Sequence, residues 1–305
     1  MPANPTFLID AASGKYVLRR KPSGELLKSA HAVDREYKVI KALADSDVPV
    51  AKAYHLCEDD SVIGSMFYVM EYIDGRVMWD PALPDTNNTE RSEIYSEMNR
   101  VLAALHSVDI EKVGLSDYGR PGNYFERQTG RWSKQYRASE TESIPEMETL
   151  MTWLPANMPA DDGRIALAHG DFRLDNMMFH PKENRVLALV DCELSTLGHP
   201  FADLAYQCMQ LRMSRDAVMP GLGNLDREAL GIPTEAEYVT QYCERMGLES
   251  IPNWPFYMAF SFFRFAAILQ GVKKRALDGN ASSEKAMAMG ELVKPLAEMA
   301  VEFCE

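Results

Sequence analysis

The sequence lacks a surplus of positive charge. Its 305 residues include 32 Lys and Arg against 45 Asp and Glu, which gives a formal net charge of −13 and a pI near 5.0. Proteins that bind nucleic acid need clustered cations to replace the counterions of the phosphate backbone. We therefore expect no nucleic-acid partner, and any anionic ligand would need local cations or a metal ion.

Cysteine pairs and targeting segments are also missing. The five cysteines are an odd number with no C-x-x-C spacing, which favours ordinary thiols in a reducing compartment. The first ten residues, MPANPTFLID, show no basic stretch followed by an apolar one, so they do not form a signal peptide. The most apolar run, 255–270, is too short for a membrane span and contains Arg264. We expect a cytoplasmic protein with no membrane segment.

The N-terminal quarter has the pattern of a small β-rich lobe. Residues 6–20 contain two apolar runs joined by a turn-forming Ala-Ser-Gly, which predicts a β-hairpin. An amphipathic helix and two more strands are predicted from apolar spacing, the helix at 25–45 and the strands within 48–59 and 65–73. Asp74 and Gly75 then break the pattern. We expect one lobe over residues 1–74 and a second over 75–305.

The remainder of the chain is mainly helical in its apolar spacing. Helices are predicted at 89–108, 145–157, 201–214, 234–246, 255–278 and 282–304. The stretch 114–135, rich in Gly, Arg and aromatic residues, is predicted to be irregular. The fold class expected from this division is α+β, with a small N-terminal lobe and a larger helical C-terminal lobe.

The segment HGDFRLDNMMFHPKENRVLALVD, residues 169–191, carries the chemistry. Asp171 is followed five residues later by Asn176, and the strand-like VLALV delivers Asp191 at its end. Phosphoryl transfer needs one carboxylate to accept a proton from the attacking hydroxyl, and an amide oxygen and a second carboxylate to hold Mg²⁺ against the phosphates of ATP. Asp and Asn also favour turns unaided, so the pair alone is weak evidence. Its position between a His-Gly turn and a strand-borne Asp is more specific.

The string HGDFRLDNMMFHP, followed by VDCELSTLGHPFADLAY, resembles the aminoglycoside phosphotransferase and choline kinase-like family. The strings KYVLRRKP, SAHAVDREYKVIKAL, VMEYIDGRV, LHSVDIEKVGL and FRFAAILQGVKKRALDGNAS resemble the branch found alone in bacteria or fused to some acyl-CoA dehydrogenases. The resemblance runs nearly end to end. It implies a two-lobed protein-kinase-like fold, ATP and Mg²⁺ as cofactors, and a small-molecule hydroxyl as phosphate acceptor.

The resemblance also assigns roles to residues. Asp171 matches the catalytic Asp, and Asn176 and Asp191 match the metal ligands. Asp203 matches an Asp that supports the catalytic loop from the next helix, and Glu36 matches the Glu that pairs with the cation of a small-lobe strand. Backbone groups of the interlobe connector would bind adenine; the matching residues are Glu71, Tyr72 and Ile73.

Four further residues near the motif have an expected role. Arg173 would offset charge on the transferring phosphoryl oxygens. His169 could join Asp171 at a metal, but with no third His or Cys at suitable spacing we interpret it as organising the loop. Glu193 shares a strand face with Asp191 and would be either a metal ligand or a support for one. Arg19 matches the position of the family's phosphate-pairing Lys in a small-lobe strand; Arg keeps the charge, and the branch that the chain resembles typically has Arg there.

The sequence departs from the family pattern at two other places. Cys192 and His199 replace the usual Trp and Asp of the branch, which leaves the metal ligands intact. The chain also begins at the end of the expected Gly-rich loop, so the first strand and its glycines would precede Met1. Either the start of the sequence is set too late, or the protein lacks this flap. Without the flap the backbone donors to the phosphates are missing, and catalysis would be weak or lost.

The function predicted from these residues is ATP- and Mg²⁺-dependent phosphorylation of a small-molecule hydroxyl. The fusion of related domains to acyl-CoA dehydrogenases favours a hydroxyacyl acceptor over an aminoglycoside. One alternative is a nucleotide-binding protein that keeps the fold without turnover, and another is a metal-dependent hydrolase built on the same carboxylates. The sequence carries no signal for an oligomeric state or for ATP against GTP.

Overall fold

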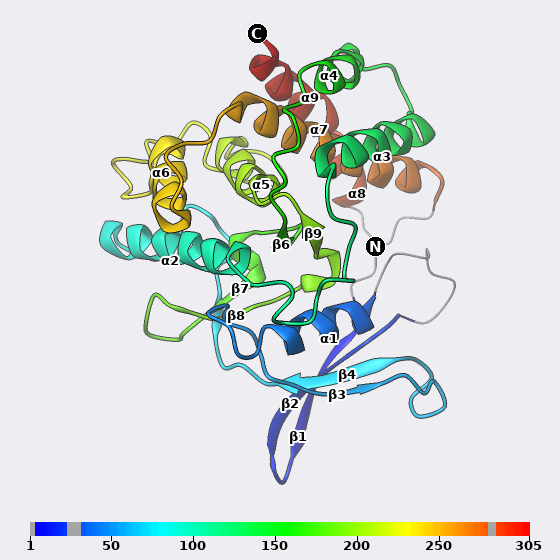
Figure 1. Cartoon of the computed structure of the whole chain (residues 1–305), viewed down its shortest axis with the longest axis vertical. Helices are drawn as coiled ribbons and strands as arrows, with labels where there is room; N and C mark the ends of the chain where they lie inside the picture. Colours follow the sequence, from blue (N-terminus) through cyan, green and yellow to red (C-terminus); the bar gives the residue numbers. More distant parts are fainter. Residues whose placement is uncertain (1–3, 23–31, 280–284) are drawn as a thin grey trace.

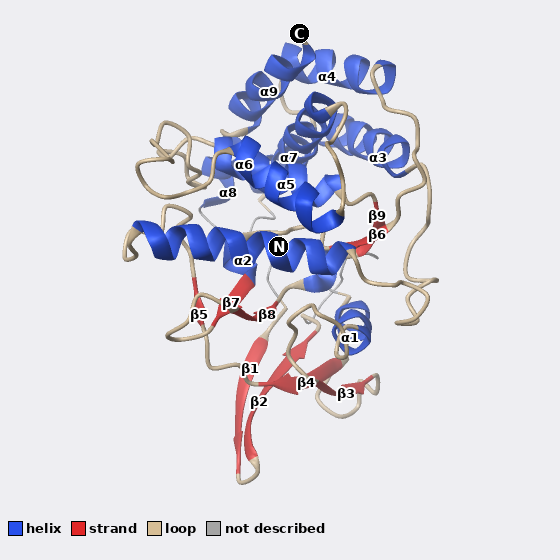
Figure 2. Cartoon of the chain, turned by 60° about the vertical axis from the view of Figure 1, so that its left-hand side comes forward, coloured by secondary structure: helices blue, strands red, loops and turns tan. Residues whose placement is uncertain are grey.

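The computed structural model describes residues 4–22, 32–279 and 285–305. A small antiparallel sheet with one helix lies at one end, and a larger, mainly helical part lies at the other (Figures 1 and 2). The predicted mixed α+β fold with a small sheet lobe is confirmed. The expected boundary at residue 74 stays a prediction.

The small sheet has the strand order β1-β2-β4-β3, with all pairs antiparallel. Its strands are β1 (Thr6–Ala11), β2 (Gly14–Arg20), β3 (Ala53–Cys57) and β4 (Phe67–Glu71). The predicted hairpin is confirmed as β1–β2, and it projects away from the helical part (Figure 2). The other two predicted strands are confirmed as β3 and β4.

The single described helix of this lobe is α1 (Val33–Ala42). Val33 and Ile40 pack with Tyr68 of β4 in a small apolar cluster, and Val39 faces the main core. The sequence predicts that this helix starts at residue 25, but residues 23–31 lie outside the described part of the chain. Its Glu36 is buried among these apolar positions, although a charged residue at mid-helix ordinarily faces solvent.

The large part contains the helices α2 (Asn88–His106), α3 (Tyr124–Ser139), α4 (Pro145–Ala156), α5 (Phe201–Arg212), α6 (Glu235–Met246), α7 (Trp254–Leu277), α8 (Lys285–Gly290) and α9 (Val293–Val301). A 3₁₀ turn, η3 (Glu302–Cys304), follows. Helix α7 contacts α3, α4, α5, α8 and α9, so it is the centre around which this part is packed (Figure 1). It is long and apolar enough to cross a membrane, but 83% of its most apolar window is buried inside the protein, as in a core helix.

Two expectations for this part are wrong. The stretch 114–135, predicted to be irregular, contains the first twelve residues of α3, because Phe125, Thr129, Trp132 and Tyr136 recur at helical spacing and are buried. Interspersed arginines and a glycine hid this stripe. The predicted single helix at 282–304 is divided: α8 ends at Gly290, where a Cβ would lie 2.7 Å from the Cβ of Lys273.

One short ladder flanks the segment 169–195, and a second lies within it. β6 (Ala166–Ala168) pairs with β9 (Thr196–Gly198), and β7 (Met177–Phe179) pairs with both β5 (Arg76–Val77) and β8 (Val186–Leu189). The 3₁₀ turns η1 (Leu174–Asn176) and η2 (Cys192–Leu194) lie between them. The motif is therefore held at both ends by backbone pairing.

Candidate active site

The loop that carries Asp171 leaves β6 through a turn at Gly170. Gly170 has φ of +83°, and a Cβ there would lie 2.7 Å from the carbonyl oxygen of Leu194. Glycine adopts a positive φ without steric cost and has no Cβ to collide. The His-Gly pair of the motif therefore lets the loop pass against the segment after β8.

Asp203, in the first turn of α5, fixes the backbone of this loop. Its carboxylate accepts hydrogen bonds from the N–H groups of His169 at 2.6 Å and Gly170 at 3.0 Å, and His106 Nε2 lies 3.4 Å away. Burial by itself raises the pKa of Asp203, but the contact with His106 and the bond from Gly170 outweigh it and lower the pKa. The buried carboxylate is thus ionised and fully engaged.

His169 joins the two halves of the motif. Its Nε2 lies 3.0 Å from the carbonyl oxygen of Val190, and its Nδ1 accepts from the N–H of Asp171 at 3.3 Å. These partners require the proton on Nε2. The residue before Asp191 is thereby tied to the turn before Asp171.

Asp171 and Asn176 lie against each other. Asn176 Nδ2 donates to the carbonyl oxygen of Asp171 at 2.8 Å and to its Oδ2 at 3.2 Å. The hydroxyl of Tyr206 on α5 donates to Asp171 Oδ1 at 2.8 Å. The sequence motif predicts Asp171 and Asn176 as site residues but does not indicate Tyr206. The position of Tyr206, one helical turn after Asp203, could have indicated it.

Arg19, Glu36 and Asp191 come together from three separate elements. Arg19 Nε on β2 lies 2.8 Å from Glu36 Oε2 on α1, and its Nη2 donates to Asp191. Asp191 has φ of +63°, a left-handed conformation that Asp tolerates better than most residues. This turn after β8 aims its carboxylate at the small lobe. The strand cation, the helix carboxylate and the motif carboxylate form one cluster.

Burial changes the ionisation of this cluster. Burial raises the pKa of Glu36 to about 7, against the opposing charge of Arg19. Burial, and then the charge of Asp191, also raise the pKa of Glu193. Glu193 lies 3.8 Å from Arg19 and accepts a hydrogen bond from Asn4 Nδ2 at 2.7 Å. Asn4 thus reaches the segment after β8 from the start of the small lobe.

Hard oxygen donors for a cation lie at one end of the β7–β8 ladder. Asn176 precedes β7, Asp191 follows β8, and the N–H of Val190 donates to the carbonyl oxygen of Asn176 at 2.9 Å. Because the amide nitrogen of Asn176 donates to Asp171, its amide oxygen is the atom left to bind a cation. Among the described residues no three His, Cys, Asp or Glu side chains form a metal cluster.

The remaining predicted residues occupy the loop and the connector. Arg173 pairs with Asp175, with Nε 2.9 Å from Oδ1, so its charge is already balanced within the loop. Glu71 ends β4, and its N–H donates to the carbonyl oxygen of Lys52 at 2.9 Å. That N–H is therefore engaged within the protein, whereas Tyr72 and Ile73 follow in the connector.

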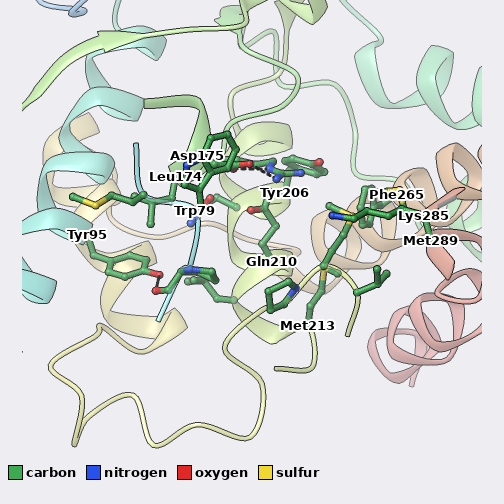
Figure 3. Close-up of a pocket in the computed structure, with 18 residues that line it drawn as sticks. Trp79, Tyr95, Leu174, Asp175, Tyr206, Gln210, Met213, Phe265, Lys285 and Met289 are labelled. Carbon is green, nitrogen blue, oxygen red and sulfur yellow. Dashed lines mark hydrogen bonds and ion pairs between the residues drawn. The ribbon is translucent and has the colours of Figure 1, made fainter. Parts of the chain in front are cut away.

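A cavity of about 470 Å³, the large cavity, opens beside the loop (Figure 3). Arg173, Leu174, Asp175 and Tyr206 line it on the loop side. Apolar side chains make up most of the rest, among them Met78, Trp79, Met213, Phe265 and Met289. Its size and lining are those of a small-molecule site.

Comparisons with known proteins agree with this geometry. Residues 3–240 match the phosphotransferase enzyme family. Acyl-CoA dehydrogenase family member 10 of Mus musculus is 52% identical over 302 residues, which are 99% of this chain and 28% of that protein. The chain thus spans less than a third of that relative's length.

Solved structures share the fold. A provisionally assigned aminoglycoside phosphotransferase from Ralstonia eutropha has a TM-score of 0.93 at 52% identity, covering 99% of this chain and 89% of that one. A thermostable mutant of aminoglycoside phosphotransferase APH(4)-Ia, in a ternary complex with AMP-PNP and hygromycin B, has a TM-score of 0.65 at 14% identity, covering 99% and 91%. The second likeness shows the fold alone. With the family match over most of its length, the chain belongs to the phosphotransferase enzyme family.

Proposed function

We propose that the protein transfers the γ-phosphoryl group of ATP, with Mg²⁺, to a hydroxyl of a small molecule in the cytoplasm. The observation that carries the proposal is the cluster in which Arg19 pairs with both Glu36 and Asp191. Through Asp191, which lies beside Asn176, this cluster connects the cation of the small lobe to the Asp171–Asn176 pair of the large lobe, and phosphoryl transfer needs both sets of groups.

The donors at the end of the β7–β8 ladder suit Mg²⁺. This ion prefers oxygen ligands and is commonly held by one or two carboxylates together with substrate phosphates, without a full protein cage. Asp191 and the amide oxygen of Asn176 would hold it. Bound there, Mg²⁺ would neutralise charge on the phosphates of the nucleotide.

The other roles follow from position. Asp171 does not itself line the large cavity, but it accepts a hydrogen bond from the hydroxyl of Tyr206, which does, so it would take the proton of an acceptor hydroxyl bound beside Tyr206. Arg19 supplies positive charge at the nucleotide end. Backbone groups of Glu71, Tyr72 and Ile73 would bind the adenine base, apart from the N–H of Glu71, which is already engaged.

The large cavity favours an apolar acceptor over an aminoglycoside. Of the described residues that line it, Asp175 is acidic and Arg173 and Lys285 are basic. Asp175 already pairs with Arg173, so the wall carries no surplus negative charge to attract the amines of an aminoglycoside. The name of the mouse relative also favours an acyl compound. We therefore propose a hydroxyacyl compound as acceptor.

A nucleotide-binding protein without turnover is the second candidate. The observation that favours it is that Arg173 is balanced by Asp175 and Asp191 by Arg19. In that arrangement the charged groups of the candidate site are already paired within the protein. Nucleotide, metal or acceptor would have to break these ion pairs in order to bind.

Turnover of γ-labelled ATP tests the proposal. We would incubate the protein with Mg²⁺ and, separately, hydroxyacyl-CoA esters, free hydroxy acids and an aminoglycoside, with Asp171→Asn as the inactive control. Label transferred to a hydroxyacyl compound by the wild type alone is the expected result. Mg-ATP binding without transfer to any acceptor would favour the second candidate, and metal-dependent hydrolysis that needs no nucleotide would favour a hydrolase.

A further inference from the structure

One face of α5 contacts the catalytic loop at two successive positions. Asp203 holds the backbone of His169 and Gly170, and Tyr206, three residues later, donates its hydroxyl to the side chain of Asp171. Residues three apart on a helix lie on the same face. Helix α5 therefore fixes both the path of the loop and the carboxylate that the loop presents.

We infer that Tyr206 is the positioning residue of Asp171 in the phosphoryl transfer proposed above. An ionised carboxylate offers about four acceptor sites on its two oxygens. Tyr206 occupies one on Oδ1 at 2.8 Å, and Asn176 reaches Oδ2 at 3.2 Å. The sites that remain are held in one orientation, ready for the hydroxyl of an acceptor.

The ionisation of Tyr206 supports this role. Burial, and then the negative charge of Asp171, raise the pKa of Tyr206 well above its ordinary value. The phenol therefore keeps its proton at neutral pH and stays a hydrogen-bond donor. It fixes the carboxylate without competing for the proton that Asp171 has to accept.

The ring of Tyr206 is itself held in place by Arg264. The guanidinium carbon of Arg264 lies 5.3 Å from the Tyr206 ring centroid and 5.8 Å from that of Trp132. Its Nη2 donates to the carbonyl oxygen of Gly170 at 2.7 Å. A buried arginine in the apolar helix α7 is costly unless it is paired. Here it joins the Tyr206 ring to the residue immediately before Asp171.

Tyr206 also belongs to the wall of the large cavity (Figure 3). Of the cavity-lining residues in the described ranges, it is the one that hydrogen-bonds to Asp171. An acceptor in this cavity thus meets the Tyr206 ring beside the carboxylate. Loss of the hydroxyl would keep the shape of the cavity wall and remove one of the two side-chain hydrogen bonds that orient the carboxylate.

Substitution of Tyr206 by Phe tests the inference, with Tyr238→Phe as a matched control. Tyr238 is a buried tyrosine of the same lobe whose hydroxyl has no hydrogen-bond partner in the described chain. Displacement of a catalytic group by about 1 Å can cost about 100-fold in rate. We expect Tyr206→Phe to lower kcat about tenfold or more, with the KM for Mg-ATP within about twofold of wild type. Tyr238→Phe should match the wild type in both.

The double variant separates positioning from general destabilisation. In an Asp171→Asn background the carboxylate is already gone, so Tyr206→Phe should lower the residual rate by less than about twofold. A purely structural role would give the full loss again. Equal losses in the two backgrounds, or unchanged kcat in the single variant, would overturn the inference.

A crystal structure of Tyr206→Phe decides the question without turnover. We expect the carboxylate of Asp171 to leave its wild-type orientation, and an unchanged orientation would overturn the positioning role. A wild-type protein that transfers phosphate to no acceptor, with Asp171 displaced in the variant crystal, would remove the proposed function and keep the positioning. The two conclusions therefore fail in different experiments.

Discussion

Arg19 Nε lies 2.8 Å from Glu36 Oε2, an ion pair that joins strand β2 to helix α1 inside the small lobe. The same guanidinium reaches Asp191, which follows β8 in the large lobe. One side chain thus connects the sheet, the helix and the motif. Helix α1 also packs against η2. A substitution at Glu36 would therefore affect the position of Asp191 both through Arg19 and through this packing.

The buried position of Glu36 predicts a pH-dependent stability. Its pKa rises to about 7 in the folded protein from an ordinary 4.5, so between these values the folded state holds a proton that the unfolded chain has released. Stability from this group is fully present below about pH 4.5 and is lost as pH rises through 7. We expect the free energy of unfolding to fall by on the order of 2 kcal/mol from pH 5 to pH 8, relative to Glu36→Gln. Urea denaturation of both proteins measures this, and parallel profiles would contradict it.

Local sequence patterns predict the parts of the fold that depend on neighbouring residues. The β1–β2 hairpin follows from its turn, and α7 follows from a long apolar run that the core encloses. Helix α3 was missed because its apolar stripe is thin and interrupted by arginines, and only packing against α7 makes it evident. Tertiary burial overrides such weak local signals.

Local sequence patterns also predict only part of the candidate site, because some of its contacts join residues far apart in the chain. The spacing within 169–191 by itself indicates Asp171, Asn176 and Asp191, since that motif is continuous in sequence. The bond from Tyr206 joins residues 35 apart, and that between Arg19 and Asp191 joins residues 172 apart. Such contacts arise from how the lobes and α5 pack, which no local pattern encodes.

Asp171→Asn should reduce turnover strongly and preserve nucleotide binding. A general base contributes about 10²- to 10⁴-fold to the rate, and Asn keeps the shape of the side chain but cannot accept the proton. We expect a loss of at least about 100-fold in kcat with Mg-ATP affinity within about threefold, measured by label transfer and calorimetry. Asp117→Asn, at an exposed Asp that pairs with Lys38, is the control. More than about a tenth of wild-type turnover would show that another group is the base.

Asp191→Asn should weaken the binding of Mg-ATP, which Asp171→Asn preserves. Asn tolerates the left-handed φ of +63°, so this change removes charge without the backbone strain that Ala would add. We expect Mg-ATP to bind about tenfold or more weakly, since contacts to charged groups contribute about 1.5–3 kcal/mol each. ATP in the presence of EDTA should bind no more weakly than to wild type, because Arg19 loses a competing carboxylate. Equal losses of Mg-ATP affinity in Asp171→Asn and Asp191→Asn would refute this division of roles.

Gly170→Ala should destabilise the protein far more than Gly163→Ala, although both glycines have a positive φ, +83° and +76°. A Cβ at Gly163 has open space around it, whereas one at Gly170 would lie 2.7 Å from the backbone oxygen of Leu194. The left-handed conformation alone costs about 1–2 kcal/mol for Ala, and the collision adds to this at Gly170 because a backbone atom cannot move aside cheaply. We expect thermal unfolding to shift by a few degrees for Gly163→Ala and by at least twice as much for Gly170→Ala. The loop displaced at Gly170 also carries Asp171, so the turnover of Gly170→Ala should fall even at temperatures below its unfolding transition. Equal melting temperatures for the two variants would show that the loop does not pass against Leu194 as described.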